Sequence, residues 1–558
     1  SDESAFLIHT VNAACHNLSF VNEKKAKLVI GEASTLNVKG NLMNNDSSKL
    51  VLTANYWGQA SVVFNSGSPK ATIEMYIPGG NGSSIDPVWQ YRGICVEHFS
   101  PITEVPLVDA DGNPIEGKTI NPWSYVYVFE WDESKNDDKN QGCWVNGRSG
   151  SDITDDTPLQ PWKGYCFANM IPVKDSALWL TYTGTLINSG KDTTLSYEYH
   201  TYDDGNGGQV PFANVGVNLI TNSFAAPLLI SKLGYPDSDS DCDKGIILYN
   251  AGSHAQWKQG INVGNQRGQA GQFSTVPRST GKQATDIITI PAGQSFFVQA
   301  TAANATLTLP YSTAISISPS TRMYLPGKEI ELEYNMLKIR VTAKSDSTQD
   351  YVALLECETC TRQYDNGYDG YKMRGDNGLP QIYAYNKFGN TAVNADSTLN
   401  KQYVGFMAGS DDETYTISFE TDKLFGYHSL YLTDRKLNET VDILAGETYQ
   451  FKGYTVGENM RFQINGITEQ EWNNDDDNDD DDDDDSNVCD LRVVGNTLYV
   501  QGFTTDHYPA ARIELFDMTG NLVWSTPLTS ERLYALPSLP QGIYTIRLGD
   551  CHVKYVTK

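Results

Sequence analysis

The sequence predicts a multidomain, all-β protein. Tyr (32) and Gly (47) are plentiful, and this composition favours strands and turns over helices. Apolar and polar residues alternate in short runs such as 50–53, 125–129 and 513–516, whereas few windows carry the 3.6-residue apolar period of a helix. With domains of roughly 150 residues each, the 558 residues divide into roughly three or four units.

Residues 1–75 consist of short strand-like runs at regular spacing, such as AKLVIGE and GQASVVFNSG, separated by Asn- and Gly-rich turns. Strands that cannot bury a face alone are expected to stack as rungs. The segment therefore predicts a β-solenoid-like, repeat-like unit. It resembles the last coils of repetitive strand segments in Bacteroidetes surface proteins.

Two larger units are expected to follow. Residues 76–310 continue as strands and long polar loops, with a hairpin around Asp111-Gly112, and predict a β-rich globular domain with β-sandwich character. The order of ALWLTYTGTLINSG, VGVNLITNSF and IPAGQSFFV resembles a recurrent strand order in such surface proteins. Residues 311–466 alternate in runs such as KEIELEYNMLKIRVTAK and QDYVALLEC, which predict a further β-sandwich.

An acidic segment separates this part from a small C-terminal module. Ten aspartates lie between Asp475 and Asp485, and a block of like charge repels itself and stays extended. Residues 467–488 are therefore predicted to be a linker. Residues 489–558 are again rich in alternating runs, and they predict a small C-terminal β-sandwich.

This module carries ARIELFDMTGNLVWST and LPQGIYTIRLGD. It resembles the type A sorting domain of Bacteroidetes proteins that leave the cell through the type IX secretion system. The matching positions, apolar strand residues and turn glycines for the most part, are Leu515, Phe516, Asp517, Gly520, Val523, Gly542, Ile543 and Tyr544. The resemblance implies export across the outer membrane, an extracellular or cell-surface location, and contact with the type IX secretion machinery. It also implies removal of the module by a sortase-like protease near 486–489 and attachment to an anionic lipopolysaccharide.

The charge and hydropathy of the chain exclude other classes. The net charge of −28 disfavours a nucleic-acid partner, because phosphates would be repelled. No run approaches the roughly 18 apolar residues that span a bilayer. Ser1 does not open a signal-peptide pattern, so we expect either a removed leader or a longer protein.

None of the eight His residues lies in a recognisable catalytic motif, and the sequence has no G-x-S-x-G elbow, HExxH motif or phosphate loop. We therefore expect a non-enzymatic adhesin or structural surface protein. The alternative is a secreted glycan-binding protein or a glycoside hydrolase that uses two facing carboxylates. Host or matrix glycans and proteins would be the partners.

Two acidic loops are candidates for calcium, the only cofactor that the sequence suggests. Alternating aspartates can direct several hard oxygens at one ion, and the first loop contains Asp237, Asp239 and Asp241. It fails the EF-hand template, because Lys244 stands at the sixth position from Asp239. The alternative is a solvated polar loop.

The second loop, YDNGYDGYKM at 364–373, offers Asp365, Asn366 and Asp369. Its oxygens could hold calcium, since its glycines allow a tight backbone. In the alternative interpretation the tyrosines pack into the sandwich, while Asp and Gly form turns.

Tryptophan offers a third candidate site. Exposed rings could stack on sugars, and Trp123, Trp131 and Trp144 lie in the long polar stretch 119–160. The alternative is that these rings fill a β core.

The nine cysteines leave at least one thiol unpaired within a monomer. Cys489 and Cys551 bracket the C-terminal module, and a disulfide closing this loop of about 60 residues would contribute about 4 kcal/mol. Cys357 and Cys360 have CxxC spacing. They predict either a local disulfide or two small buried residues.

Overall fold

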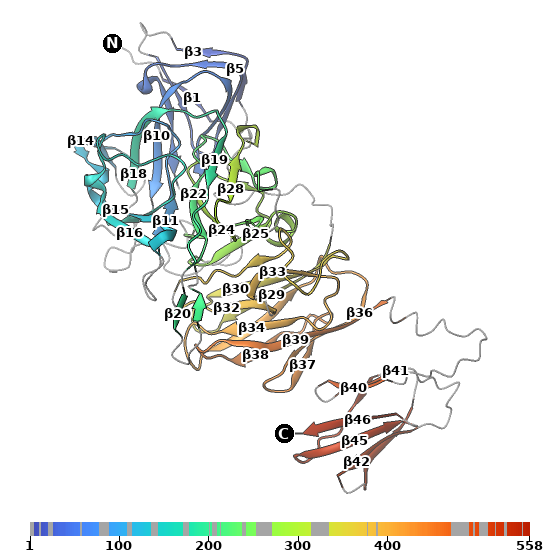
Figure 1. The fold of residues 1–558 in the computed structure, drawn as a ribbon. Coiled ribbons are helices and arrows are strands. Elements are labelled where there is room, and N and C mark those ends of the chain that lie inside the picture. Colours follow the sequence, from blue (N-terminus) through green and yellow to red (C-terminus); the bar gives the residue numbers. More distant parts are fainter. Residues whose placement is uncertain are drawn as a thin grey trace.

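The computed structural model describes most of the chain, and the statements below concern these residues. They are 5–9, 13–20, 26–55, 58–77, 89–108, 114–135, 143–170, 178–199, 201–203, 209–211, 214–236, 241–252, 270–313, 334–376, 378–386, 389–469, 472, 490–494, 497–501, 512–518, 521–528, 533–548 and 551–557. They are almost entirely strands, with α2 (Gly281–Thr285) as a short α-helix. The predicted fold class, all-β and multidomain, is confirmed (Figure 1).

The chain begins as a stack of parallel strands, drawn in blue in Figure 1. One sheet of the stack holds β1 (Ala5–Ile8), β4 (Lys27–Ile30), β6 (Leu50–Leu52) and β10 (Lys70–Ile77), and the other holds β2 (Ala13–Cys15), β3 (Leu18–Ser19), β5 (Thr35–Met43) and β9 (Ser61–Ser66). Phe6 is in register with Leu28, and Leu28 with Leu50, so successive coils are about 22 residues long. The stacked rungs expected from the spacing of strands and turns are therefore present.

The stack passes into an antiparallel part at β10, which pairs antiparallel with β18 (Leu178–Thr185). A four-stranded sheet follows, formed by β11 (Trp89–Arg92), β17 (Tyr165–Asn169), β15 (Val126–Trp131) and β16 (Trp144–Ser149). Ile30 and Leu50 from the stack share one hydrophobic core with Trp123 and Phe167. Residues on both sides of position 75 therefore pack together, and the division of the chain at that point stays a proposal.

A second core lies between residues 187 and 309 and includes Phe224, Leu248 and Phe296. Its main sheet holds β22 (Val217–Thr221), β27 (Ser295–Gln299), β24 (Gly245–Tyr249) and β25 (Phe273–Pro277). Shorter strand pairs are spread over both of these parts of the chain. They are β7 (Ala54–Asn55) with β8 (Gly58–Gln59), β12 (Ser100–Pro101) with β18, β13 (Val105–Val108) with β14 (Pro114–Ile120), β19 (Lys191–Thr194) with β28 (Thr306–Leu309), β20 (Thr201–Asp203) with β21 (Gln209–Pro211), and β23 (Leu228–Leu229) with β26 (Thr289–Ile290). The pairing of β13 with β14 is the expected hairpin, although its turn lies outside the described residues.

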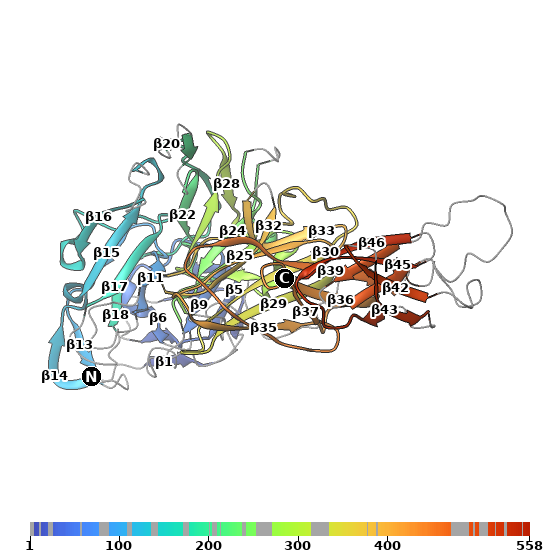
Figure 2. The ribbon, with the colours of Figure 1, turned by 90° about the horizontal axis from the view of Figure 1, so that it is seen from below.

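The strands expected as a sandwich in 311–466 join into one 11-stranded, near-barrel sheet (Figure 2). The unit has a large core of its own, and a smaller cluster that includes Cys357 and Val393 packs with Ala284 of the preceding part. They are β29 (Asn335–Ala343), β30 (Gln349–Glu356), β31 (Gly370–Tyr371), β32 (Gln381–Asn386), β33 (Gly389–Asp396), β34 (Tyr403–Met407), β35 (Thr414–Glu420), β36 (Tyr427–Asp434), β37 (Glu439–Asp442), β38 (Tyr449–Lys452) and β39 (Glu458–Thr468). We call this unit the near-barrel. Most of its pairs are antiparallel, but β30 and β33 run parallel.

The C-terminal module, red in Figure 1, has two small sheets and a core of its own. One sheet holds β40 (Asp490–Val494), β41 (Thr497–Gln501) and β44 (Leu533–Ala535), and the other holds β43 (Leu522–Pro527), β42 (Arg512–Asp517), β45 (Gly542–Leu548) and β46 (Cys551–Thr557). The core is built from alternate strand positions such as Ile513, Leu515, Ile546 and Leu548. A separate apolar core is what allows a segment to fold as a unit. Among the described residues, no helix is both long and apolar enough to cross a membrane.

Candidate functional site

The loop at 364–373 docks the near-barrel onto the preceding core. The side chain of Asn366 accepts a hydrogen bond from the backbone N–H of Lys244 at 2.6 Å and donates one to the carbonyl of Cys242 at 2.9 Å. Nearby, the backbone N–H of Ser279 donates to the carbonyl of Gly367 at 2.8 Å. Gly367 has a φ of +87°, a conformation that glycine adopts without a steric penalty. The loop and the segments that it touches are called the junction below.

The carboxylates of this loop already serve as hydrogen-bond acceptors. Asp369 is fully buried, and its two oxygens accept from the backbone N–H groups of Ala395 at 2.6 Å and Asp365 at 2.8 Å. Asp365 in turn accepts from the backbone N–H of Thr361 at 2.6 Å. Calcium would share these same oxygens with the backbone N–H groups. These bonds favour the alternative in which the residues shape the turn and the junction, and a calcium site at Asp365, Asn366 and Asp369 stays a prediction.

The other calcium candidate is only partly described. Asp237 and Asp239 lie outside the described residues, and the backbone carbonyl of Asp241 accepts from the N–H of Thr301 at 3.0 Å. In the part of the chain that the structure covers, no three His, Cys, Asp or Glu side chains come together as a metal site.

Two buried carboxyl groups dominate the electrostatics of the junction. Tyr364 donates its hydroxyl hydrogen to Asp243 at 2.8 Å and stacks on Tyr371, with ring centroids 4.1 Å apart. Burial raises the pKa of Asp243 to about 7, although the hydrogen bond from Tyr364 opposes the rise. Burial likewise raises the pKa of Asp369 to about 7, against the bonds from Ala395 and Asp365. A carboxyl group loses its hydration when buried, and this disfavours the charged form.

The same loop carries one member of a buried ion pair, and a second hydrogen bond crosses the junction nearby. Lys372 Nζ lies 2.6 Å from Asp350 Oδ2, and both side chains are 3% exposed. Burial raises the pKa of Asp350, while the charge of Lys372 opposes this rise. Across the junction, Tyr249 donates its hydroxyl to Asp376 at 2.8 Å. These partners could not be predicted from the sequence, because the two members of each pair lie 22 and 127 positions apart.

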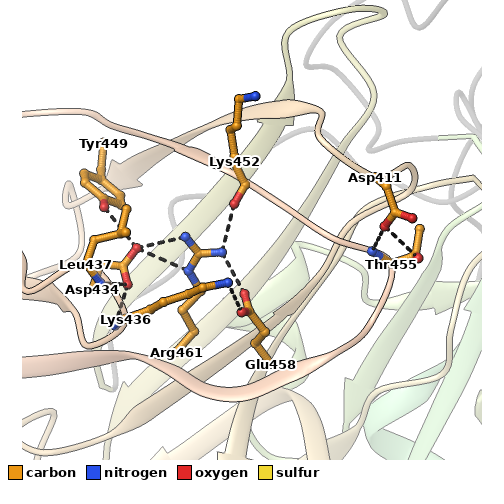
Figure 3. A network of polar contacts seen from close by, with 9 residues as sticks. All are labelled: Asp411, Asp434, Lys436, Leu437, Tyr449, Lys452, Thr455, Glu458 and Arg461. Atoms are coloured by element: carbon orange, nitrogen blue, oxygen red, sulfur yellow. Dashed lines mark hydrogen bonds and ion pairs between the residues drawn. The ribbon is translucent and has the colours of Figure 1, made fainter.

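Figure 3 shows a second buried network at one end of the near-barrel. The guanidinium of Arg461 contacts Asp434 Oδ2 at 3.0 Å and Glu458 Oε2 at 2.7 Å, and Arg461 and Asp434 are almost fully buried. Tyr449 donates to the same Asp434 oxygen at 2.9 Å. The Arg461 guanidinium also lies 4.4 Å from the centroid of the Phe451 ring. The guanidinium also donates to the backbone carbonyl of Lys452 at 3.0 Å, so this network ties β36 to β38 and β39.

The three tryptophans proposed for glycan contact have different environments. Trp123 is fully buried and donates its Nε1–H to the carbonyl of Thr181 at 3.2 Å. Glycan contact is therefore wrong for Trp123, because its ring has no exposed face. Trp131 and Trp144 are partly buried, and their ring centroids lie 5.0 Å apart. For these two residues glycan contact stays a prediction.

Cys357 and Cys360 are free thiols, both buried against Met336 and Leu355. Of the two alternatives, the structure has two small buried residues and no disulfide between them. Burial raises the pKa of the Cys360 thiol, so it is a weak nucleophile. The proposed disulfide between Cys489 and Cys551 lies outside the described residues and side chains.

The export residues of the C-terminal module fall into two groups. Leu515 is fully buried and Tyr544 is 7% exposed, so both belong to the core. Val523 and Ile543 are 42% and 38% exposed. The others that are described, Phe516, Asp517 and Gly542, are intermediate, and Gly520 lies outside the described residues. The exposed members could contact a receptor, whereas the buried ones shape the module.

The sequence of the chain matches a protein family and is similar to a curated bacterial protein. The family described as "Domain of unknown function (DUF8693)" matches residues 111–465, which is more than half of the chain. The chain is also 25% identical over 476 residues to a minor fimbrium subunit, Mfa5, of Porphyromonas gingivalis. This similarity covers 78% of the chain but 35% of the relative. The chain therefore spans about a third of the length of the curated relative it matches.

Proposed function

The chain belongs to the DUF8693 family, and from this premise and its similarity to a fimbrium subunit we propose that it is an adhesin-like structural protein of the bacterial cell surface. The observation that carries the proposal is the 476-residue similarity to a protein named as part of a fimbrium. The architecture supports it, because stacked strands, a near-barrel and a buried junction form an extended β framework. The test is to label intact cells with an antibody against residues 1–466. A signal that surface proteolysis removes is expected, and a signal only after lysis would refute the proposal.

The finer proposal is export through the type IX secretion system by the C-terminal module. Its support is the resemblance of 489–558 to a type A sorting domain and the separate core of the module. Deletion of 489–558 is expected to leave the remainder folded and to hold it in the periplasm. Delivery of the truncated protein to the surface at the normal level would refute this route.

Export and folding of the module can be separated by two substitutions. Leu515→Asp places a charge in the core and is expected to unfold the module and abolish export. Ile543→Asp changes an exposed position and is expected to abolish export while circular dichroism of the isolated module stays unchanged. Normal export of the Ile543→Asp protein would contradict a role of this surface in recognition.

Processing at the surface is part of the same proposal. We expect the mature surface form to end near 486–489 and to carry an anionic lipopolysaccharide. Intact mass spectrometry of protein released from cells distinguishes this form from one that retains Lys558. Retention of Lys558 in the surface form would refute the processing step.

The adhesive role has its own test. Purified residues 1–466 are applied to a glycan array and to immobilised mucin and matrix proteins. Binding to one of these surfaces is expected for an adhesin. Trp144→Ala, at a partly buried ring, is expected to weaken glycan binding, and Trp123→Phe, in the core, is the matched control that should leave it unchanged. Absence of binding on every surface would leave a purely architectural role.

The hydrolase alternative requires two carboxylates that face each other across a cleft. Asp243 and Asp369 both lie near Tyr364, but Tyr364 donates to the carboxyl group of Asp243, and both carboxyl oxygens of Asp369 accept from backbone N–H groups. A small pocket at the junction contains one carboxylate, Asp350, which Lys372 neutralises. These observations give the hydrolase alternative no specific support.

A further inference from the structure

Residues in register on successive strands of the parallel stack form rows of apolar side chains. In the first coil these side chains are not covered by a further coil within the described residues. Along the row that contains Phe6, Leu28 and Leu50, exposure falls from 64% at Phe6, through partial burial at Leu28, to 0% at Leu50. Each member of this row covers the next. Phe6 lies on the edge strand β1, whose only described pairing is with β4.

The other inward rows show the same gradient. Ile8 is partly buried, whereas Ile30 and Leu52, its counterparts in the next two coils, are 0% and 1% exposed. In the opposite sheet Cys15 is only partly buried, and Val38, its counterpart, is 0% exposed. The opening therefore extends over both sheets of the stack.

The strands at this end of the stack are also edge strands. Within the described residues β1 pairs only with β4, and β2 only with β5. An edge strand presents a row of free N–H and C=O groups that can accept another strand. Stacked-repeat proteins normally close such an end with a terminal repeat whose outer face is polar. Phe6 and Leu7, at 64% and 56% exposed, do not form such a cap.

We propose that this end is an interface for one further coil of the same ladder, carried by the same polypeptide. The coil would pair parallel with β1 and β2 and place apolar side chains over Phe6, Ile8 and Cys15. Continuity with the existing stack supports a parallel coil, because β1, β4 and β6 already pair parallel and in register. The relative is also much longer than the part that this chain matches.

Cys15 provides the test. It is the one free cysteine that is not buried among those that the structure describes, and it lies on the open rows. The rate of its alkylation by N-ethylmaleimide is measured by peptide mass spectrometry in two materials, the 558-residue protein and the polypeptide as the bacterium makes it. We expect alkylation at least about tenfold slower in the bacterial polypeptide. Equal rates would overturn the proposal.

Two variants control this measurement. Lys39→Cys, at an exposed position of β5, is expected to react equally in both materials and shows that the reagent reaches the stack. Phe6→Asp is expected to restore fast alkylation of Cys15 in the bacterial polypeptide, because a buried charge would displace the covering coil. It should not unfold the 558-residue protein, where Phe6 is exposed. Continued protection of Cys15 in Phe6→Asp would count against the coil.

A second copy of the chain is the competing occupant. It would protect Cys15 in the 558-residue protein in a concentration-dependent way, and light scattering would give twice the mass of 61.7 kDa. This result would replace the proposed coil by a dimer.

Discussion

Tyr364 donates its hydroxyl hydrogen to Asp243 across 2.8 Å, although the two residues are 121 positions apart in the chain. The bond joins the near-barrel to the core that precedes it. Both side chains are buried well enough that burial raises the pKa of each. The strength of the junction therefore depends on the protonation of Asp243.

Asp243→Asn is expected to weaken the pH dependence of stability. Asp243 has a folded pKa raised to about 7 from 3.8. Its contribution is therefore fully present below about pH 4 and is lost as the pH rises to about 7, on the order of 1 to 4 kcal/mol. Asparagine stays neutral and can still accept from Tyr364. The measurement is the urea unfolding free energy between pH 4 and 8.

Two features make this measurement specific. Asp369 has a similarly raised pKa, so part of the pH dependence should survive in Asp243→Asn. Asp412→Asn, at a 71% exposed side chain, is the matched control and should follow the unsubstituted protein. An unchanged slope in Asp243→Asn would show that this carboxyl group does not govern the junction.

Lys372→Met is expected to destabilise the near-barrel by about 3 to 5 kcal/mol, because it leaves the buried carboxylate of Asp350 without its partner. The double variant Lys372→Met with Asp350→Leu should regain much of this loss, since it removes both charges. Urea unfolding of the three proteins at neutral pH gives the comparison. A double variant that is less stable than Lys372→Met would contradict this account.

Arg461→Lys is expected to cost about 3 kcal/mol or more, despite the conserved charge. Lysine cannot reproduce the planar set of donors that reaches both Asp434 and Glu458, and it leaves a buried carboxylate poorly satisfied. Thermal unfolding followed by circular dichroism measures the effect. Lys452→Met, at a side chain that is 64% exposed, is the control and should change stability by less than about 0.5 kcal/mol.

Trp123→Ala is expected to destabilise the first core by about 3 to 5 kcal/mol through the cavity it leaves. Tyr127→Ala, on the neighbouring strand β15 and 41% exposed, should cost far less. Hydrogen exchange of the amides in β15 and β18 measures the local effect. A Trp123→Ala protein as stable as Tyr127→Ala would contradict the assignment of Trp123 to the core.

Spacing and alternation in the sequence predicted stacked rungs in 1–75 and strands in 311–466, because these patterns are local. The parallel pairing of the stack and the near-barrel closure were not predicted, because they depend on contacts between distant segments. The functions of individual polar residues depend on partners elsewhere. Nothing local distinguishes an Asp that faces a cation from Asp369, which faces two backbone N–H groups. The burial of Trp123 likewise depends on strands that the chain reaches only later, such as β18 with Thr181.

The near-barrel is connected to the core before it by the peptide between Thr313 and Tyr334 and also by non-covalent contacts, among them those of the loop at 364–373. The hydrogen bonds of Asn366 and Tyr364 with 242–244 do not depend on the covalent route. A protease that cuts that peptide once would therefore yield two fragments that migrate together on a native gel and separate only in denaturant. The fold would tolerate such a nick without shedding its C-terminal half.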